Sequence, residues 1–320
     1  MTTENPTPWA KFNRRAFLST LACAGASRLT SAWGGETPAV QTPGFHLFSK
    51  SFQWLDFDQL AEFAAAAGLQ GIEYTVRPKG HIEPERVGTD LPRAVAAARK
   101  QGLTCKMMVT AITGSDTPYA ENVLKTAADC GLSLYRTGYY YYDDKTAPDQ
   151  QLETFKTQLG SLEKLNTRLS MTAGYQVHRT VGKRVFFGAV VWDLYAVLKS
   201  FDPQFFSCQY DLFHAFSETS GSWRTTLQLM APYIRSLCHK DFLRHASQGI
   251  ICCPAGEGIV PWKEYVARCK EWKTDQALKS IHCEHEILSK EEQNLPFAEK
   301  YKRALQRTQH EVNFFKGIWS

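Results

Sequence analysis

The chain has 320 residues, 43% of them hydrophobic and 22% charged, and a formal net charge of +5. This length and apolar content suffice for one large core and argue against intrinsic disorder. The basic residues form no block of the kind that nucleic-acid binding needs, and no run of about 18 apolar residues could span a membrane.

The first 36 residues indicate a targeting segment. Residues 13–18 (NRRAFL) form a twin-arginine pattern, a short apolar run follows over residues 16–27, and the small residues Ser31 and Ala32 offer a cleavage site. We therefore expect a signal for twin-arginine export over residues 1–36, a folded domain over residues 37–320, and a periplasmic or secreted mature protein. An amphipathic first helix is the alternative.

From residue 44 onward, short apolar runs alternate with amphipathic stretches. The predicted strands cover residues 45–48, 71–76, 103–110, 132–139, 169–177, 205–211, 234–242 and 278–285. The predicted helices cover residues 56–67, 90–100, 118–130, 150–165, 192–200, 222–231, 261–272 and 297–315. Glycines 68, 102 and 131 each end a helix just before a strand.

Eight strands, each followed by a helix, predict parallel pairing and a (β/α)₈ TIM barrel. A doubly wound open sheet is the alternative, but no G-x-G-x-x-G motif opens a helix after the first strand. The nine cysteines include no C-x-x-C pair, so we expect neither structural zinc nor required disulfides.

Polar residues follow the predicted strands, where the reacting groups of such barrels gather. The candidates after the second and fifth to eighth strands are Glu73, Arg77, His81, Tyr175, Gln176, His178, Asp211, His214, His239, Lys240 and Glu284. Because side chains alternate along a strand, we expect Gln176, His178, Asp211, Lys240 and Glu284 to converge in the barrel mouth. His239 has the opposite parity, which indicates the outer layer.

Two carboxylates beside amide and imidazole groups suit either of two roles. They could hold a divalent cation such as Mn²⁺ or Mg²⁺, or they could transfer protons next to a carbonyl group.

Several short motifs, in order, resemble the sugar phosphate isomerase/epimerase family, whose members have a xylose isomerase-like barrel. The resemblance covers about residues 44–316 and rests on residues 71–73 (GIE), 211–214 (DLFH), 240–241 (KD), 256–258 (GEG) and 283–284 (CE).

The resemblance implies a metal site on the fifth to eighth strands. Its candidates here are Gln176, Asp211, His239 and Glu284, with Mn²⁺ or Mg²⁺ expected and Zn²⁺ as an alternative. Gln176 stands where the family has Glu, and Cys238 stands where it has His. Since an amide cannot act as a base, an epimerase with two catalytic glutamates is not expected.

The first functional hypothesis is an exported isomerase, epimerase or lyase acting on a sugar, keto-sugar or glycoside. Its expected catalytic residues are Glu284, His178, Lys240 and Glu73, and its expected substrate contacts are His214, Arg77, His81 and Tyr175. The second hypothesis is a barrel that binds carbohydrate without chemistry. A nuclease of the endonuclease IV type is the third, and too few histidines stand at the strand ends for it. The partner is a small carbohydrate in the first two cases, and a homo-oligomer is compatible with both.

Overall fold

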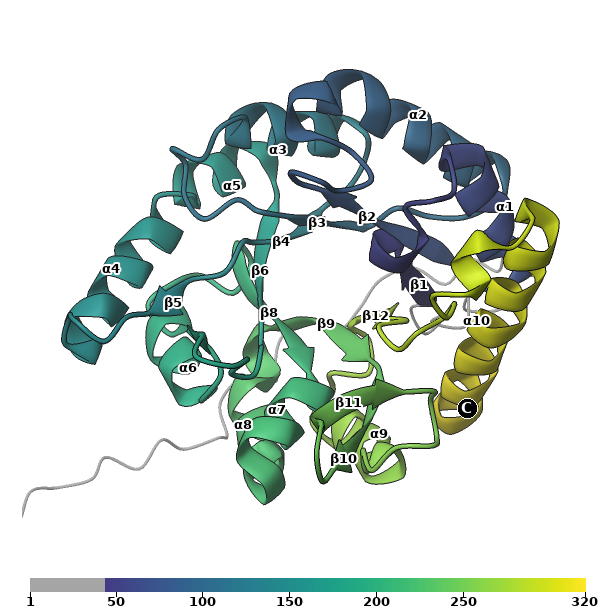
Figure 1. The fold of residues 1–320 in the computed structure, drawn as a ribbon. Coiled ribbons are helices and arrows are strands. Elements are labelled where there is room, and N and C mark those ends of the chain that lie inside the picture. Colours follow the sequence, from purple (N-terminus) through teal and green to yellow (C-terminus); the bar gives the residue numbers. More distant parts are fainter. Residues whose placement is uncertain (1–43) are drawn as a thin grey trace, which may run out of the picture. The chain divides into compact units, whose positions relative to one another are not determined.

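The computed structural model describes residues 44–320, so the predicted export signal and the boundary at residue 37 lie outside the described residues. Eight parallel strands close a barrel, with β12 hydrogen-bonded to β1 (Figure 1). The barrel strands, in spatial order, are β1 (Phe45–Phe48), β2 (Gly71–Val76), β3 (Met107–Thr110), β4 (Leu134–Arg136), β6 (Thr172–Gln176), β8 (Phe206–Asp211), β9 (Ile234–His239) and β12 (Leu278–Ile281). The predicted (β/α)₈ barrel is therefore confirmed.

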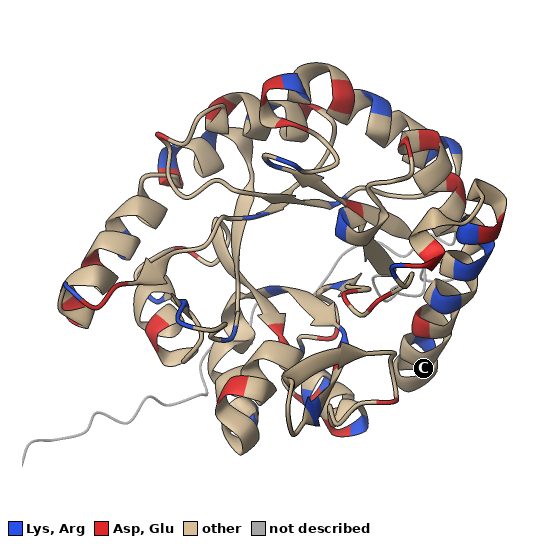
Figure 2. Cartoon of the chain, in the orientation of Figure 1, with Lys and Arg blue, Asp and Glu red and all other residues tan. Residues whose placement is uncertain are grey.

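Helices surround the barrel because each has one apolar face to bury against the strands. The α-helices are α1 (Phe57–Ala66), α2 (Val87–Lys100), α3 (Ala120–Asp129), α4 (Pro148–Gly160), α5 (Glu163–Leu169), α6 (Trp192–Leu198), α7 (Leu212–Thr219), α8 (Trp223–Met230), α9 (Trp262–Glu271) and α10 (Phe297–Trp319). Figure 2 shows residues of both charges along the outer surfaces of α2 and α10.

Two small antiparallel sheets and one helix were not predicted. Strand β5 (Tyr141–Tyr142) pairs with β7 (Val185–Phe186), and β10 (Asp241–His245) pairs with β11 (Gly249–Cys253). Helix α7 follows β8 directly, and the stretch predicted as one helix over residues 150–165 is divided between α4 and α5. All of these differences lie outside the barrel strands, in the segments that connect them.

Side-chain direction alternates along the strands as predicted. On β9, Leu237 and His239 face the helices, whereas Ser236 and Cys238 face the interior with Gln209 and Gln176 as contacts. The described residues hold eight cysteines, all free thiols. Among residues 44–320, no helix has the length and apolar character needed to cross a bilayer.

Candidate active site

The inward side chains at the carboxyl ends of β6, β8, β9 and β12 form one connected group. Pairing of β8 with β9 sets Asp211 beside Cys238, and pairing of β9 with β12 sets Cys238 beside Ser280. These parallel pairings bring the ends of the strands to the same rim. Residues predicted to converge from separate strands therefore meet in a single polar cluster.

Lys240 lies at the centre of this cluster. Its ammonium Nζ is 3.1 Å from Asp211 Oδ2, 2.6 Å from Glu284 Oε2 and 2.9 Å from His214 Nε2. The lysine side chain is only 3% exposed. Burial opposes its charge, but Asp211 and Glu284 outweigh this and raise the pKa of Lys240 above its ordinary value. The three protons of the ammonium group thus have three partners inside the protein.

Glu284 is held between two lysines. Its Oε1 accepts from Lys50 Nζ at 2.8 Å, while its Oε2 faces Lys240. Burial acts to raise the pKa of Glu284, but Lys240 and Lys50 hold it well below its usual range. Glu284 is therefore an ionised carboxylate at neutral pH, and it becomes a stronger base only when a lysine leaves it.

Gln176 links the strands across the barrel. Its Oε1 accepts from Arg136 Nη1 at 2.6 Å and from the Tyr139 hydroxyl, and its Nε2 donates to Asp211 Oδ2 at 2.8 Å. Asp211 Oδ1 accepts from the backbone N–H of His214 at 3.2 Å. Burial raises the pKa of Asp211 above its ordinary value, while Lys240 and the N–H of His214 act in the opposite direction and favour the ionised acceptor.

Two neutral imidazoles stack at the rim. The rings of His178 and His214 are 3.9 Å apart, and His178 also stacks on Phe186 at 4.1 Å. Burial and then the charge of Lys240 lower the pKa of His178 to about 3. Its Nδ1 lies 2.9 Å from the Arg179 carbonyl, which can only accept, so Nδ1 carries the proton and Nε2 the lone pair.

His214 has the reverse arrangement. Its Nε2 faces the Lys240 ammonium, which can only donate, so the proton of the neutral ring is on Nδ1. That Nδ1 is buried without a protein partner, as are Arg136 Nε and His282 Nδ1. These atoms are hydrogen-bonding groups that a bound polar molecule can use.

Glu73 lies deeper than the other candidates. It is completely buried on β2, where it accepts hydrogen bonds from Ser280 Oγ and, at 3.2 Å, from Gln209 Nε2. Burial raises the pKa of Glu73 and favours its neutral form. Glu73 therefore forms the floor beneath the cluster.

Three predicted site residues lie elsewhere. His239 points outward, stacks on Trp262 and accepts from Trp319 Nε1 at 2.9 Å, so it cannot serve as a metal ligand in the mouth. Tyr175 also points outward, where its hydroxyl accepts from the backbone N–H of Tyr140. His81 bonds to the Leu55 carbonyl at 2.8 Å beside α1. Strand parity explains the placement of His239 and Tyr175.

Arg77 lies at the edge of the cluster and is partly exposed. Burial and the nearby charge of Arg136 lower its pKa, while Tyr139 and Glu284 act in the opposite direction. Arg77 therefore interacts electrostatically with Arg136, Tyr139 and Glu284 of the cluster.

Four residues of the cluster were not predicted as site residues, namely Lys50, Arg136, Cys238 and His282. Arg136 carried the clearest signal, since an arginine inside an apolar strand run must find an acceptor in the barrel. His282 shares strand parity with Glu284, which also could have indicated it.

The neighbouring Asp241 fixes the rim beside Lys240. Its carboxylate accepts from the N–H groups of Phe242, Gly256 and Val260 and from Trp262 Nε1, at 2.8–3.2 Å. A Cβ atom at Gly258 would lie 2.0 Å from Asp241 Oδ1, so only glycine allows this approach. The KD and GEG motifs therefore act as one structural unit.

The predicted Mn²⁺ or Mg²⁺ ligand set does not fit this cluster. His239 faces the helices, and the Gln176 oxygen already accepts hydrogen bonds from Arg136 and Tyr139. Lys240 Nζ lies between the carboxylates of Asp211 and Glu284. Asp211, Cys238 and His282 do have potential ligand atoms within 4.8 Å of one another. Sulfur and nitrogen donors of this kind suit Zn²⁺ better than Mg²⁺, but the Asp211 oxygen that faces Lys240 would have to be released.

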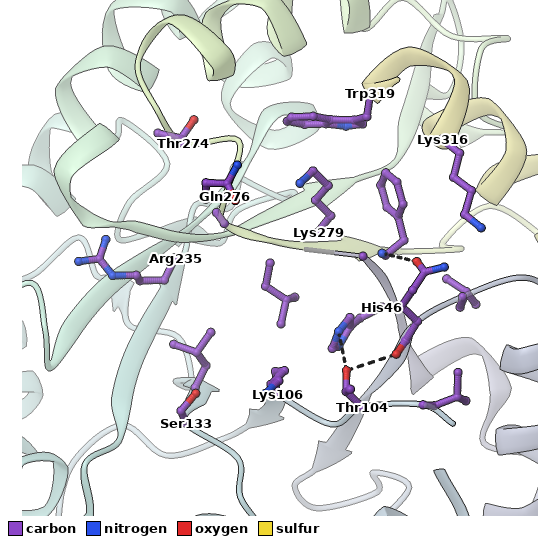
Figure 3. Close-up of a pocket in the computed structure, with 18 of the residues that line it drawn as sticks. His46, Thr104, Lys106, Ser133, Arg235, Thr274, Gln276, Lys279, Lys316 and Trp319 are labelled. Atoms are coloured by element: carbon purple, nitrogen blue, oxygen red, sulfur yellow. Dashed lines mark hydrogen bonds between the residues drawn. The ribbon is translucent and has the colours of Figure 1, made fainter. Parts of the chain in front are cut away.

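A cavity of about 1210 Å³ opens at the opposite, amino-terminal face (Figure 3). Its lining includes Lys106, Arg235, Lys273, Lys279 and Lys316. Lys316 donates to the Gly68 carbonyl, Lys279 to the Asp275 carbonyl and Arg235 to three backbone carbonyls. These side chains hold turns together. Among residues 44–320, no Asp or Glu side chain lines the cavity, so the described lining lacks the paired acid and base groups of the mouth.

No known family profile and no curated protein sequence matches the chain. Solved structures do match. D-psicose 3-epimerase from Clostridium cellulolyticum has a TM-score of 0.63 at 12% identity, with 87% of this chain and 99% of that chain covered. The probable 3-DHS dehydratase of Bacillus anthracis has a TM-score of 0.62 at 14% identity, with 85% and 98% covered. The 3-keto-D-glucoside 4-epimerase of E. coli has a TM-score of 0.61 at 12% identity, with 83% and 98% covered. The chain therefore shares the xylose isomerase-like TIM barrel fold with sugar epimerases.

Proposed function

We propose that the protein is an enzyme that transfers a proton at a carbon next to a carbonyl group of a carbohydrate, as sugar isomerases and epimerases do. The observation that carries the proposal is the buried Lys240 ammonium between Asp211 and Glu284, with His178 and His214 stacked above it. A cation beside a carboxylate and a neutral imidazole supplies the groups that enolisation requires.

Lys240 provides the electrophile. A substrate carbonyl that accepts a hydrogen bond from Nζ must replace one of its three internal partners, and Glu284 is the most exposed of them, with a side chain 21% exposed. The released Glu284 loses one of its two lysine partners, so its pKa rises and it can take the neighbouring C–H proton. The ammonium then stabilises the enolate oxygen that forms.

His178 is the second proton carrier. Its Nε2 carries the lone pair of the neutral ring, because the hydrogen bond to the Arg179 carbonyl fixes the proton on Nδ1. Neutral imidazole can accept a proton from one substrate atom and return it to another. It takes the role for which Gln176 is unsuited, because an amide has no basic lone pair.

Aromatic rings and unpaired polar atoms in the mouth support a carbohydrate substrate. Tyr139 and Phe186 are 5.1 Å apart in an edge-to-face pair, and Arg136 lies over the Tyr139 ring. The buried unpaired nitrogens of His214 and His282 suit sugar hydroxyl groups. Two of the similar solved structures are described as epimerases of D-psicose and of 3-keto-D-glucosides.

The test is deuterium exchange. Purified protein is incubated in D₂O with D-fructose, D-psicose, D-tagatose and 3-keto-glucosides, and deuterium in recovered sugar is measured by mass spectrometry and NMR. We expect exchange at a carbon next to the carbonyl, and its loss in Glu284→Gln. The control Glu299→Gln alters an exposed ion pair on α10 and retains exchange. Absence of exchange with every sugar contradicts the proposal.

A lyase that uses the same proton abstraction is a second candidate. Gln176 cannot act as the second base that a two-glutamate epimerase uses, whereas elimination needs one base and a leaving group. Release of an alcohol from a 3-keto-glycoside would identify it. Sugar binding without exchange or elimination would indicate a binding protein.

Export through the twin-arginine pathway is proposed from residues 13–18 and is consistent with a free rather than phosphorylated sugar substrate. Replacement of Arg14 and Arg15 by Lys should retain the protein in the cytoplasm of a host that has this pathway. Cell fractionation measures the result, and equal export of both proteins contradicts it.

A further inference from the structure

Positive charge is already present in the mouth without a metal ion. Lys240 lies between the carboxylates of Asp211 and Glu284, Lys50 binds Glu284, and Arg136 binds the neighbouring Gln176. A divalent ion added to this buried group would meet Lys240 at contact distance from both of its carboxylate ligands. Charges of the same sign repel strongly where water is excluded.

Each carboxylate oxygen of Asp211 and Glu284 already accepts from an N–H group of the protein. Asp211 Oδ1 accepts from His214 and Oδ2 from Gln176 and Lys240; Glu284 uses one oxygen for each lysine. Gln176 presents its N–H to Asp211, so its amide is turned with the oxygen toward Arg136 and Tyr139. A metal site requires these oxygens to point at a shared centre, and here Lys240 Nζ occupies that centre.

We propose that the Lys240 ammonium takes the place of a divalent cation, so that the reaction of this barrel is independent of metal. This inference rests on the proposed function for its catalytic part, in which Lys240 stabilises the enolate oxygen. Arg136 is a positioning residue, because its bond to Gln176 turns the amide so that its N–H holds Asp211 against Lys240.

Removal of the ammonium should expose a latent metal site. Asp211, Cys238 and His282 remain within reach of one ion once Lys240 is gone, and their oxygen, sulfur and nitrogen donors suit Zn²⁺ or Co²⁺. Co²⁺ alone is the probe, because a cobalt–thiolate bond gives a near-ultraviolet charge-transfer band. The proteins are wild type, Lys240→Met, Lys240→Met with Cys238→Ser, and Lys279→Met, which removes another buried lysine on the outer side of β12.

The expected result is a thiolate band in Lys240→Met alone, with no band in wild type, in the double variant or in Lys279→Met. Far-ultraviolet circular dichroism and thermal unfolding establish that each protein is folded, and Lys240→Arg, which keeps the charge, provides a folded comparison without the band. A band in wild type overturns the inference, and so does failure of folded Lys240→Met to bind Co²⁺.

A second measurement separates this inference from the proposed function. Deuterium exchange by wild type is compared before and after removal of metal by a chelator and after addition of Mn²⁺, Mg²⁺ or Zn²⁺. Equal exchange supports metal independence, and exchange that is lost with the chelator and restored by one metal overturns it. If no sugar exchanges but the Co²⁺ results hold, the proposed function fails while Lys240 remains the resident cation.

Discussion

The two ends of the barrel differ in what their cations bind. At the carboxyl end, Lys240 is buried against two carboxylates and an imidazole, whereas at the amino end Lys316 and Lys279 bind backbone carbonyls. The amino end has a cavity of about 1210 Å³, but its lysines bind carbonyl acceptors that cannot take up protons at neutral pH. A large cavity therefore does not by itself indicate a site for proton transfer, which needs acid and base groups buried close together.

The largest contrast between the two ends should appear in catalysis. His178→Gln at the mouth should lower the rate of deuterium exchange by about 10²–10⁴-fold, because a positioned acid–base group contributes that much. His46→Gln, which alters a buried histidine at the amino-terminal cavity, should leave the rate within a small factor. Exchange rates on the same sugar measure both. Equal losses in the two variants would remove the distinction between the ends.

Stability should show the next largest difference. Lys240→Met leaves Asp211 and Glu284 without their shared buried cation, which should lower the free energy of unfolding by about 3–5 kcal/mol. Lys316→Met removes an exposed lysine from a carbonyl after α1 and should cost about 0.3–1 kcal/mol. Urea unfolding measures both values. A loss in Lys240→Met no larger than that in Lys316→Met would show that the Lys240 pairs contribute little to stability.

A smaller effect is expected on the outer face of the same strand. His239→Gln breaks the bond from Trp319 and disturbs the Trp262 stack, which should cost about 1–3 kcal/mol of unfolding free energy. Because His239 faces away from the mouth, the exchange rate and Co²⁺ binding should not change. A change in either, with the protein folded, would mean that His239 does reach the site.

The most gradual effect should come from pH. Burial lowers the pKa of His178 to about 3 at the mouth and that of His46 to about 4 at the other end. An unfolded histidine binds a proton near pH 6.5, so the unfolded state holds more protons below that pH. Stability should therefore fall steadily as pH drops from about 6.5 toward 4. Urea midpoints measured across this range should vary less in His178→Gln and in His46→Gln, and unchanged slopes would place both pKa values near 6.5.

The barrel itself could be predicted because its repeating unit is local. All eight strands were predicted from short apolar runs and from the glycines that end the first three helices. Strand β2 was predicted with its observed bounds. The β5–β7 and β10–β11 pairs were missed since two- to five-residue strands in connecting segments have no long periodic pattern. Helix α7 was missed because it begins at the residue directly after the β8 strand.

The polar cluster could be predicted only in part. Strand parity correctly brought together Gln176, Asp211, Lys240 and Glu284. Strand parity also indicated that His239 faces outward, whereas the resemblance to the family suggested His239 as a metal ligand. Sequence could not show that Lys240 Nζ lies between two carboxylates or that the Gln176 amide turns its N–H toward Asp211, since both depend on side-chain conformations set by contacts from distant strands.

The anchoring of Asp241 has a consequence for redesign. Its carboxylate binds Phe242, at the start of the β10–β11 hairpin. It also binds Gly256, Val260 and Trp262, where the chain returns to the barrel wall. The tip of that hairpin, around residues 244–250, therefore extends from a base that Asp241 holds at both ends. We expect it to accept replacement by other loops while Lys240, Asp211 and Glu284 keep their positions.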